Sequence, residues 1–369
     1  MRTVVNTWRH RARRVRDAWN NWCDALRQLG ELVESSARTD LERAEGYRYL
    51  TRLVRLGLEM QIEHGNPENP SLYSLSHETA KVGADNPDNV YLNAAIDGRY
   101  QYEITGTIGE ARYMSFGSKE NRYAIDGTMA STGELDKSAL QTAEDGSVRI
   151  VVSSEPADGN WLPMTATSNM LLVRQTFDDR SREAPARLSI RRLDAAPRYR
   201  ALSLDDLEQR LSRVLAIAGG TASMFLGWVK NFERDHHNRF RLGDQRFFQA
   251  AGGDPNICYV YAYWELAPDE VLQVVSEVPR CELWNFQLTN PWMESLDYRF
   301  FAVHLNSSQA ALDEDGRIRI HVSHKPVAGL RNNLTTLGHE RGLMLMRWVG
   351  ADTHPLPALK RVKLSAVAT

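Results

Sequence analysis

The chain contains one pattern of segments twice, and this internal repeat limits its possible folds more than any other feature. The segment order is the same in both halves. The matched pairs are residues 83–91 with 251–259, 100–106 with 284–290, 145–150 with 315–320, 160–174 with 333–347 (without a gap) and 185–188 with 357–360. We therefore predict a duplicated unit, each copy made of a capped helix and about six short strands.

Helix-start signals lie at equivalent points of the two copies. Residues 39–42 (Thr-Asp-Leu-Glu) form a capping-box pattern, and residues 203–206 (Ser-Leu-Asp-Asp) form a related one. In both cases the hydroxyl side chain can accept a hydrogen bond from an amide that the first helical turn leaves unpaired. We expect one helix to begin at each site.

The strands are indicated by alternation and by turn residues. Residues 317–324 alternate apolar and polar side chains, as expected for a half-buried antiparallel strand. The Asp-Gly pairs at 145–146 and 315–316 suit tight turns with positive φ. The predicted fold class is α+β, mainly β, with two related antiparallel, sandwich-like sheet units, each preceded by a helix. The expected domains are residues 1–38, 39–195 and 196–369, with the two units joined near residues 194–201.

Residues 1–38 predict a long amphipathic helix. Apolar residues recur there at steps of three and four, with arginines on the other faces. Three roles remain open for this helix: packing on its own domain, pairing with a second copy to form a homodimer, or lying on a membrane surface. The apolar stripe consists of Val4, Val5, Trp8, Ala12, Val15, Trp19, Trp22, Leu26, Leu29 and Val33.

Composition excludes several classes. Lys and Arg number 45 against 47 Asp and Glu, a net charge of −2, so a nucleic-acid partner is not expected. Three cysteines without metal-ligand spacing fit a cytoplasmic location. The longest uncharged run, residues 214–229, is short for a bilayer span and contains Gly219 and Gly220, so it predicts a buried helix and no membrane span.

No known cofactor motif occurs. The chain has no dinucleotide fingerprint, phosphate loop or nucleophile elbow, so we expect no organic cofactor. The adjacent His236 and His237 would point about 100° apart on a helix, which makes them poor joint metal ligands. We therefore expect no metal site.

Several segments resemble a known family. Residues 85–91, 160–163, 172–177 and 338–342, the last before Arg347-Trp348, look like bacterial proteins with the DUF1214 domain, which often occurs beside a DUF1254 domain. The resemblance covers most of residues 39–364. It implies a β-sandwich-rich fold with inserted helices, and it implies no settled activity.

Differences between the copies mark candidate site residues. Residues 284–298 are richer in polar and aromatic side chains than the segment matched to them. Asn285, Gln287 and Thr289 share one strand face, and such a row of amides beside tryptophan suits a small, partly apolar ligand. The alternative is a hairpin whose polar face is satisfied internally. The candidates in this segment are Asn285, Gln287, Asn290, Trp292, Glu294, Asp297 and Tyr298.

A second difference concerns titratable groups. His339 aligns with Ala166, and Arg341 aligns with Ser168. His339 could move a proton near neutral pH, with Glu294 or Asp297 as its partner. Alternatively, His339 satisfies a loop carbonyl. Arg174 and Arg347 occur in both copies and predict a shared structural pairing.

An aromatic row also distinguishes the second copy. Tyr259, Tyr261 and Tyr263 fall on one face of a strand that ends at Trp264. Such a row can stack on sugars or line a pocket for isoprenoid or steroid-like ligands, or it can simply pack across strands. Residues 267–280, with Pro268 near their start, predict a short helix that forms either a lid or a surface insertion.

Two function classes follow. The first is a small-molecule metabolic enzyme without an organic cofactor, with acid–base chemistry in an aromatic-lined pocket of the second unit. Its catalytic residues would be His339, Glu294 and Asp297. The second is a non-catalytic β-sandwich module that binds carbohydrate or assembles with itself. The expected ligand is small and hydrophobic or sugar-like, and the candidate binding residues are Asn285, Gln287, Asn290, Trp292, Tyr298, Asn333, Arg341, Tyr261 and Trp264.

Overall fold

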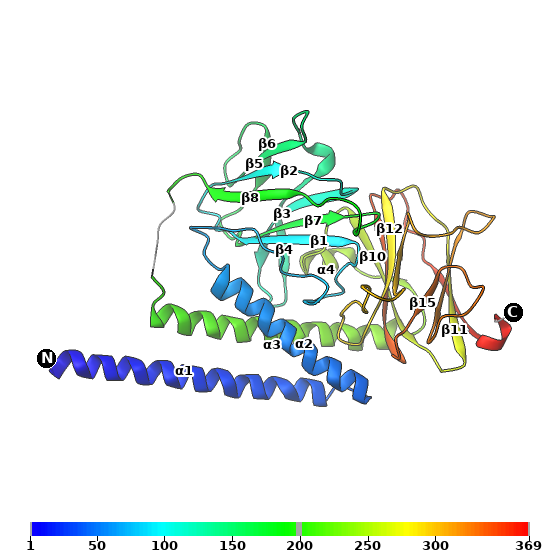
Figure 1. Cartoon of the computed structure of the whole chain (residues 1–369), viewed down its shortest axis with the longest axis horizontal. Coiled ribbons are helices and arrows are strands. Elements are labelled where there is room, and N and C mark those ends of the chain that lie inside the picture. Colours follow the sequence, from blue (N-terminus) through cyan, green and yellow to red (C-terminus); the bar gives the residue numbers. More distant parts are fainter. Residues whose placement is uncertain (1, 197–200, 368–369) are drawn as a thin grey trace.

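Two β-sandwiches and a layer of long helices make up the computed structural model, which describes residues 2–196 and 201–367, with side chains from residue 16 onward (Figure 1). Part of the expected junction at residues 194–201 lies outside the described residues. The helices are α1 (Arg2–Glu34), α2 (Asp40–Leu58), α3 (Leu204–Asp235) and α4 (Gln245–Ala250), with a π-helical turn at Glu59–Glu63 and 3₁₀ turns at Lys137–Ala139 and Leu364–Ala366.

The first sandwich packs two four-stranded sheets of orders β1-β7-β3-β4 and β6-β5-β2-β8. Apolar side chains from both sheets, including Ile104, Phe116, Ile150 and Val173, form one buried core between them. Its strands are β1 (Asn89–Ala95), β2 (Tyr102–Thr107), β3 (Tyr113–Asn121), β4 (Met129–Asp136), β5 (Ser147–Ser153), β6 (Asn160–Pro163), β7 (Met170–Thr176) and β8 (Arg187–Arg192).

The second sandwich repeats this plan, with sheet orders β13-β12-β16-β10-β9 and β15-β14-β11-β17. Only the edge strand β9 is added, and each unit contains one parallel pair, β5 with β6 and β14 with β15. Its strands are β9 (Arg241–Leu242), β10 (Ile257–Glu265), β11 (Glu270–Ser276), β12 (Leu283–Thr289), β13 (His304–Asn306), β14 (Ile318–Ser323), β15 (Asn333–Thr335), β16 (Arg341–Val349) and β17 (Ala358–Lys363). The duplication is therefore visible strand by strand, from β1/β10 to β8/β17.

The topology corrects two sequence interpretations. Residues 267–280 do not form a helix: they contain β11, whose Leu272 and Val274 enter the sandwich core. Because β11 occupies the place of β2, residues 284–290 correspond to β3 and not to residues 100–106. The registers agree with this, since Tyr113 pairs with Thr176 as Leu283 pairs with Val349.

A third correction concerns the alignment of residues 160–174 with 333–347, which contains a one-residue gap. The Asn160 side chain bonds both backbone groups of Gln141 and the carbonyl of Arg149. Asn332 bonds the backbone of Ala311 and the carbonyl of Arg319 in the same way. Asn160 is thus equivalent to Asn332, while Asn333 takes the place of Trp161.

The helix-start and turn predictions are confirmed. Thr39 and Ser203 accept hydrogen bonds from the backbone N–H of Glu42 and Asp206 at the starts of α2 and α3. Gly146 and Gly316 have φ of 77° and 78°, the left-handed region that glycine enters without strain.

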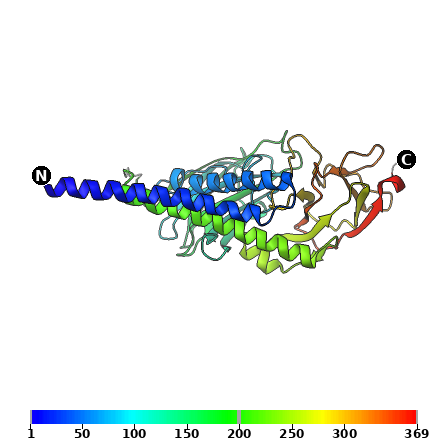
Figure 2. The same cartoon turned by 90° about the horizontal axis from the view of Figure 1, so that it is seen from below.

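The long helices pack together along one side of both sandwiches. In two views α1 lies beside α3, and α2 crosses α3 (Figures 1 and 2). Val33 of α1, Leu53 of α2 and Ala222 of α3 share a buried apolar cluster. Trp19 remains 51% exposed on α1, and pairing of this helix with a second copy stays a prediction. The stripe residues before residue 16 lie outside the described side chains.

Helix α3 is long and apolar enough to cross a membrane by length and composition alone. Half of its most apolar window is buried inside the structure, against α1, α2 and β10. A core helix of a folded domain has the same properties.

Candidate functional site

The interface between the two sandwiches is built from reciprocal contacts. Arg174 of β7 donates a hydrogen bond to the carbonyl of Gly252, in the loop before β10. Arg347, its equivalent in β16, donates to the carbonyl of Ala84, in the loop before β1. Each unit thus holds the other through the same arginine, which confirms the expected structural pairing. These reciprocal contacts relate the two sandwiches by an approximate two-fold axis that passes through the interface.

The two arginines differ in their remaining contacts. Arg347 Nη1 donates to Gln287 Oε1 at 2.5 Å and to Asn285 Oδ1 at 3.3 Å. Among the described residues Arg174 Nη1 has no hydrogen-bond partner, but it forms an ion pair with Asp254, whose Oδ2 lies 3.5 Å away. Burial opposes the charge of Arg174, but Asp254 together with Tyr259 and Glu134 outweighs burial and raises the pKa of Arg174.

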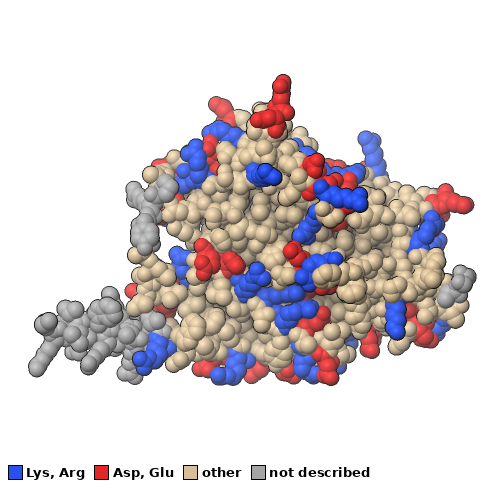
Figure 3. All heavy atoms as spheres, in the orientation of Figure 1, with Lys and Arg blue, Asp and Glu red and all other residues tan. Residues whose placement is uncertain are grey.

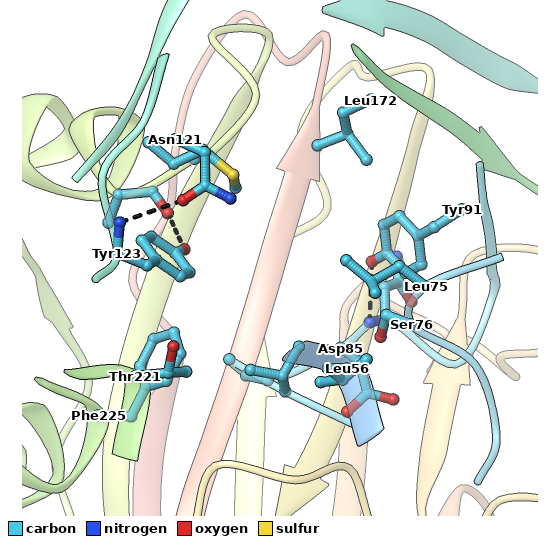
Figure 4. Close-up of a pocket in the computed structure, with 18 of the residues that line it drawn as sticks. Leu56, Leu75, Ser76, Asp85, Tyr91, Asn121, Tyr123, Leu172, Thr221 and Phe225 are labelled. Carbon is cyan, nitrogen blue, oxygen red and sulfur yellow. Dashed lines mark hydrogen bonds between the residues drawn. The ribbon is translucent and has the colours of Figure 1, made fainter. Parts of the chain in front are cut away.

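A cavity of about 190 Å³ lies at this interface and is lined by both sandwiches and by α2, α3 and α4. Its walls are mainly apolar, and the side chains of Arg174 and Arg347 form part of them. Figure 4 shows Tyr123, Thr221 and Phe225 on one side, and Tyr91, Leu75 and Leu56 on the other. The Oγ atoms of Ser76 and Thr221, both residues of the lining, have no hydrogen-bond partner in the part of the chain that the structure describes. The site can therefore receive an apolar molecule with a few polar atoms.

The aromatic row of β10 (Tyr259, Tyr261 and Tyr263) lies in two different environments. Tyr259 and Tyr261 line the cavity, and burial raises the pKa of Tyr259 to about 12. Tyr263 accepts a hydrogen bond from Arg341. Trp264 points to the opposite face, inside the second sandwich, where it donates to the carbonyl of Leu343. Trp264 cannot share a pocket with Tyr261, because side chains one and three residues apart on a strand point to opposite faces.

His339 lies elsewhere, in a polar pocket of about 90 Å³ between α2 and the second sandwich. Its Nε2 is 2.6 Å from Glu45 Oε2, and its Nδ1 is 2.7 Å from the carbonyl of Thr336. Asn290 donates to both Glu45 and Glu294, and Arg52 donates to Glu294 at 2.5 Å. The acid–base residues and the aromatic row thus form two sites and not the single pocket expected from the sequence.

The electrostatics favour the charged form of His339. Burial opposes its charge, but the hydrogen bond and charge of Glu45 outweigh burial and raise the pKa of His339. Burial likewise opposes the charge of Glu45, and His339 lowers the pKa of Glu45. Burial raises the pKa of Glu294 despite Arg52. Both ring nitrogens of His339 are engaged within the chain, so a substrate would have to displace Glu45 or the Thr336 carbonyl to exchange a proton with the ring.

Other expected site residues fasten α2 to the second unit. Trp292 Nε1 donates to the carbonyl of Glu42, and Arg341 forms a two-pronged ion pair with the Glu42 carboxylate at 2.7 Å on both prongs. Trp292 also packs against Tyr49. These contacts explain why the second copy carries larger polar groups here: they bind a helix.

The remaining candidates are spread out. Asn285 and Gln287 are fully buried at the sandwich interface, where Asn285 donates to Asn86. Asp297 reaches the rim of the polar pocket, where it pairs with Arg299 at 2.8 Å. Tyr298 accepts from Arg180 at 3.1 Å. Asn333 bonds Ser323 at 2.9 Å and lines neither cavity.

Sequence reasoning missed the residues of α2. Glu45 and Arg52 complete the polar pocket from a helix in the other half of the chain. The only sequence signal for them is the run of charges at 42, 45, 48 and 52, which a solvated helix face would also show.

Over the residues that the structure describes, no three metal-ligating side chains gather. Acidic and basic side chains are interspersed over the face shown in Figure 3.

Comparison with known proteins places this architecture in a family. Residues 89–178, from β1 to just beyond β7, match the DUF1214 family, described as a protein of unknown function. The crystal structure of an uncharacterized protein from Burkholderia cenocepacia has 44% sequence identity and a TM-score of 0.92, over 95% of this chain and 97% of that chain. The VPA0106 protein from Vibrio parahaemolyticus has 13% identity and a TM-score of 0.49, over 90% and 100%. No curated protein matches.

The chain is thus a double β-sandwich protein with a helical layer. It belongs to the DUF1214 family. The matched region covers β1 to β7 of the first sandwich, and the second sandwich repeats the same strand order.

Proposed function

We propose that the protein binds a small, largely apolar molecule in the cavity between its two sandwiches. The observation that carries this proposal is the space of about 190 Å³, whose walls are mainly apolar and include a few polar side chains such as Asn89, Asn93 and Asn121. Small-molecule sites in proteins typically combine mainly apolar walls with a small number of polar groups.

The volume of the cavity indicates the size of ligand that it can hold. An apolar cavity of about 150 Å³ holds one benzene molecule. The cavity here therefore suits a monocyclic compound with a short substituent, a smaller body than the steroid-like ligands expected from the aromatic row.

The test is ligand binding by the full chain and by a variant with a filled cavity. Leu172→Trp adds an indole where Leu172 lines the wall, and Ile125→Trp adds the same ring at a position that is 72% exposed. We expect monosubstituted benzenes to give saturation-transfer NMR signals with the wild type and with Ile125→Trp, but not with Leu172→Trp. Equal signals from all three proteins, or none from the wild type, would refute the proposal.

Acid–base chemistry at His339 is the second candidate function, favoured by the 2.6 Å contact with Glu45 inside a polar pocket. A catalytic imidazole needs a pKa close to the operating pH. NMR titration of the His339 ring therefore separates the two roles: a pKa near 7 supports catalysis, and a pKa well above it supports a structural ion pair.

A further inference from the structure

We infer that the polar pocket between α2 and the second sandwich binds a small carboxylate with a single negative charge, held by the free edge of the Arg52 guanidinium. This pocket is separate from the cavity between the sandwiches, so the inference does not depend on ligand binding there.

Arg52 uses only one of its nitrogens within the chain. Its Nη1 donates to Glu294 Oε1 at 2.5 Å. Among the described residues Nε and Nη2 of Arg52 have no hydrogen-bond partner, and neither is one of the fully buried polar atoms. The side chain lines the pocket and is 13% exposed. The edge formed by Nε and Nη2 carries two parallel N–H groups, which match the two oxygens of a carboxylate.

The same edge of arginine binds carboxylates elsewhere in this chain. Nε and Nη2 of Arg341 both donate to the Glu42 carboxylate at 2.7 Å, and Nε and Nη2 of Arg299 donate to Asp297 at 2.9 and 2.8 Å. In Arg52 the equivalent edge is open. A ligand carboxylate can therefore make the contact that Glu42 makes with Arg341.

The charges around Arg52 favour an anion. The lining of the pocket has five basic and three acidic side chains, with His339 counted in its charged form. Glu294, behind Arg52, adds a fourth carboxylate and leaves an excess of one positive charge. The basic side chains are those of Arg48, Arg52, Lys81, Arg299 and His339, and the acidic ones are those of Glu45, Glu78 and Asp297.

The excess of one charge indicates a monoanion. Outside the lining, Arg180 pairs with Glu78, and the negative charge of Asp85 acts on Lys81, so these two outer groups cancel. A monoanion therefore neutralises the pocket. A dianion would leave an unbalanced negative charge in a partly buried site, which is unfavourable.

Lys81 adds a second cation that a ligand can stabilise. Its Nζ donates to the carbonyls of Ser295 at 2.7 Å and Leu296 at 2.9 Å, which are neutral acceptors. The residue is 3% exposed, and burial lowers the pKa of Lys81 although carboxylates surround it. An anion in the pocket would offset part of this effect of burial through its charge.

The size of the pocket restricts the ligand. Its volume is about 90 Å³, whereas a cavity of about 150 Å³ holds one benzene molecule. An acid of two or three carbons therefore fits. Leu41, 38% exposed, and the Arg48 side chain, 50% exposed, belong to the lining, so the pocket is open to solvent.

Three probes test the inference: acetate, acetamide and sulfate. Acetate and acetamide have nearly the same size and shape, but only acetate is charged, and sulfate is a dianion. We expect the wild type to bind acetate about tenfold more tightly than acetamide, as hydrogen bonds between charged partners warrant, and to bind sulfate less tightly than acetate. Saturation-transfer NMR of the methyl groups at pH 7 gives the dissociation constants, with sulfate as a competitor and no other oxyanion in the buffer.

Arg52→Lys keeps a positive charge beside Glu294 and removes the two-pronged edge. We expect this variant to bind acetate about tenfold more weakly than the wild type. Arg43→Lys is the matched control: Arg43 lies on the same helix but pairs with Asp40 outside the pocket, so acetate binding should not change. Thermal unfolding checks that both variants fold.

Arg48→Gln gives a second test that does not depend on the folding of Arg52→Lys. The Arg48 side chain is half exposed, so its replacement leaves the packing of α2 intact. Removing its charge should weaken acetate binding about threefold, the size expected for one charge at a partly exposed site.

The outcomes separate this site from the cavity between the sandwiches. Equal binding of acetate and acetamide, unchanged acetate binding in Arg52→Lys or in Arg48→Gln, or tighter binding of sulfate than of acetate would each refute the inference. Leu172→Trp, which fills the other cavity, should bind acetate as the wild type does; if it does not, acetate lies in that cavity and the inference is wrong. If the wild type binds no acetate, the inference fails and the proposal for the apolar cavity is unaffected.

Discussion

Arg174 and Arg347 make the same bond in opposite directions, each to a loop carbonyl of the other sandwich. The contacts across the interface are therefore reciprocal: β7 binds the loop before β10, and β16 binds the loop before β1. The predictions below test these contacts, the packing of α2 and the cavity at the interface.

Removing one of these two interface arginines should destabilise the whole chain. Arg347→Met leaves Gln287 Oε1 and the carbonyl of Ala84 buried without their donor, and we expect a loss of about 3 kcal/mol in the free energy of unfolding. Urea denaturation measures it. Arg27→Ala, which removes an exposed ion pair with Asp24, is the control and should change the free energy by less than about 0.5 kcal/mol. A similar small loss for Arg347→Met would contradict the interface as described.

Two glycine-to-alanine substitutions should change the stability of the protein in opposite directions, because α2 packs closely against Trp292. Alanine in a helix interior is normally favoured over glycine by about 1 kcal/mol. At Gly227 in α3 a new Cβ would meet no other part of the described structure within 4 Å apart from its own stretch of helix, so Gly227→Ala should stabilise the protein. Gly46→Ala in α2 would place the Cβ 2.5 Å from the Trp292 ring and should destabilise it instead. The melting temperatures of the two variants give the comparison. A higher melting temperature for Gly46→Ala would mean that α2 is not closely packed against Trp292.

Stability should fall as the pH rises above neutral, because the pKa of His339 is raised in the folded state. The folded state binds the His339 proton more tightly than the unfolded state does, whose value is 6.5. The stabilisation is therefore fully present below pH 6.5 and is lost as the pH rises through the folded-state pKa. His339→Gln should flatten this part of the curve of unfolding free energy against pH. An unchanged slope in the variant would show that another group titrates there.

The unpaired hydroxyl of Thr221 predicts a stabilising change in the cavity wall. Thr221→Val keeps the shape and removes a buried Oγ without a protein partner, so we expect a gain of about 1 kcal/mol in the unliganded protein. Thr289→Val removes a hydroxyl that donates to the carbonyl of Asn290 at 3.1 Å and should destabilise the protein. Urea denaturation of both variants gives the comparison. Equal losses would indicate that the Thr221 hydroxyl has a partner.

Local patterns predicted much of the fold. Alternation placed Asn285, Gln287 and Thr289 on one face and Phe286 in the core, and the structure agrees. The same alternation caused the wrong pairing of residues 100–106 with 284–290. Any two half-buried strands share a period of two, so similarity of pattern could not identify which strand of the repeat was which.

The site depends on contacts that no local pattern contains. His339 and its carboxylate partner Glu45 are 294 residues apart, and the sequence offered the nearer Glu294 and Asp297 instead. The carbonyl partners of Arg174 and Arg347, which belong to Gly252 and Ala84, likewise lie in the opposite sandwich, and no local sequence pattern shows this.

The attachment of α2 to the second sandwich has a consequence for synthesis of the chain. Glu42 is made 299 residues before Arg341, a delay of roughly 15–60 s at typical translation rates. Throughout that time Glu42 and Glu45 lack their partners Arg341 and His339. The first half of the protein therefore leaves the ribosome unfinished, and the last strands to be translated complete it.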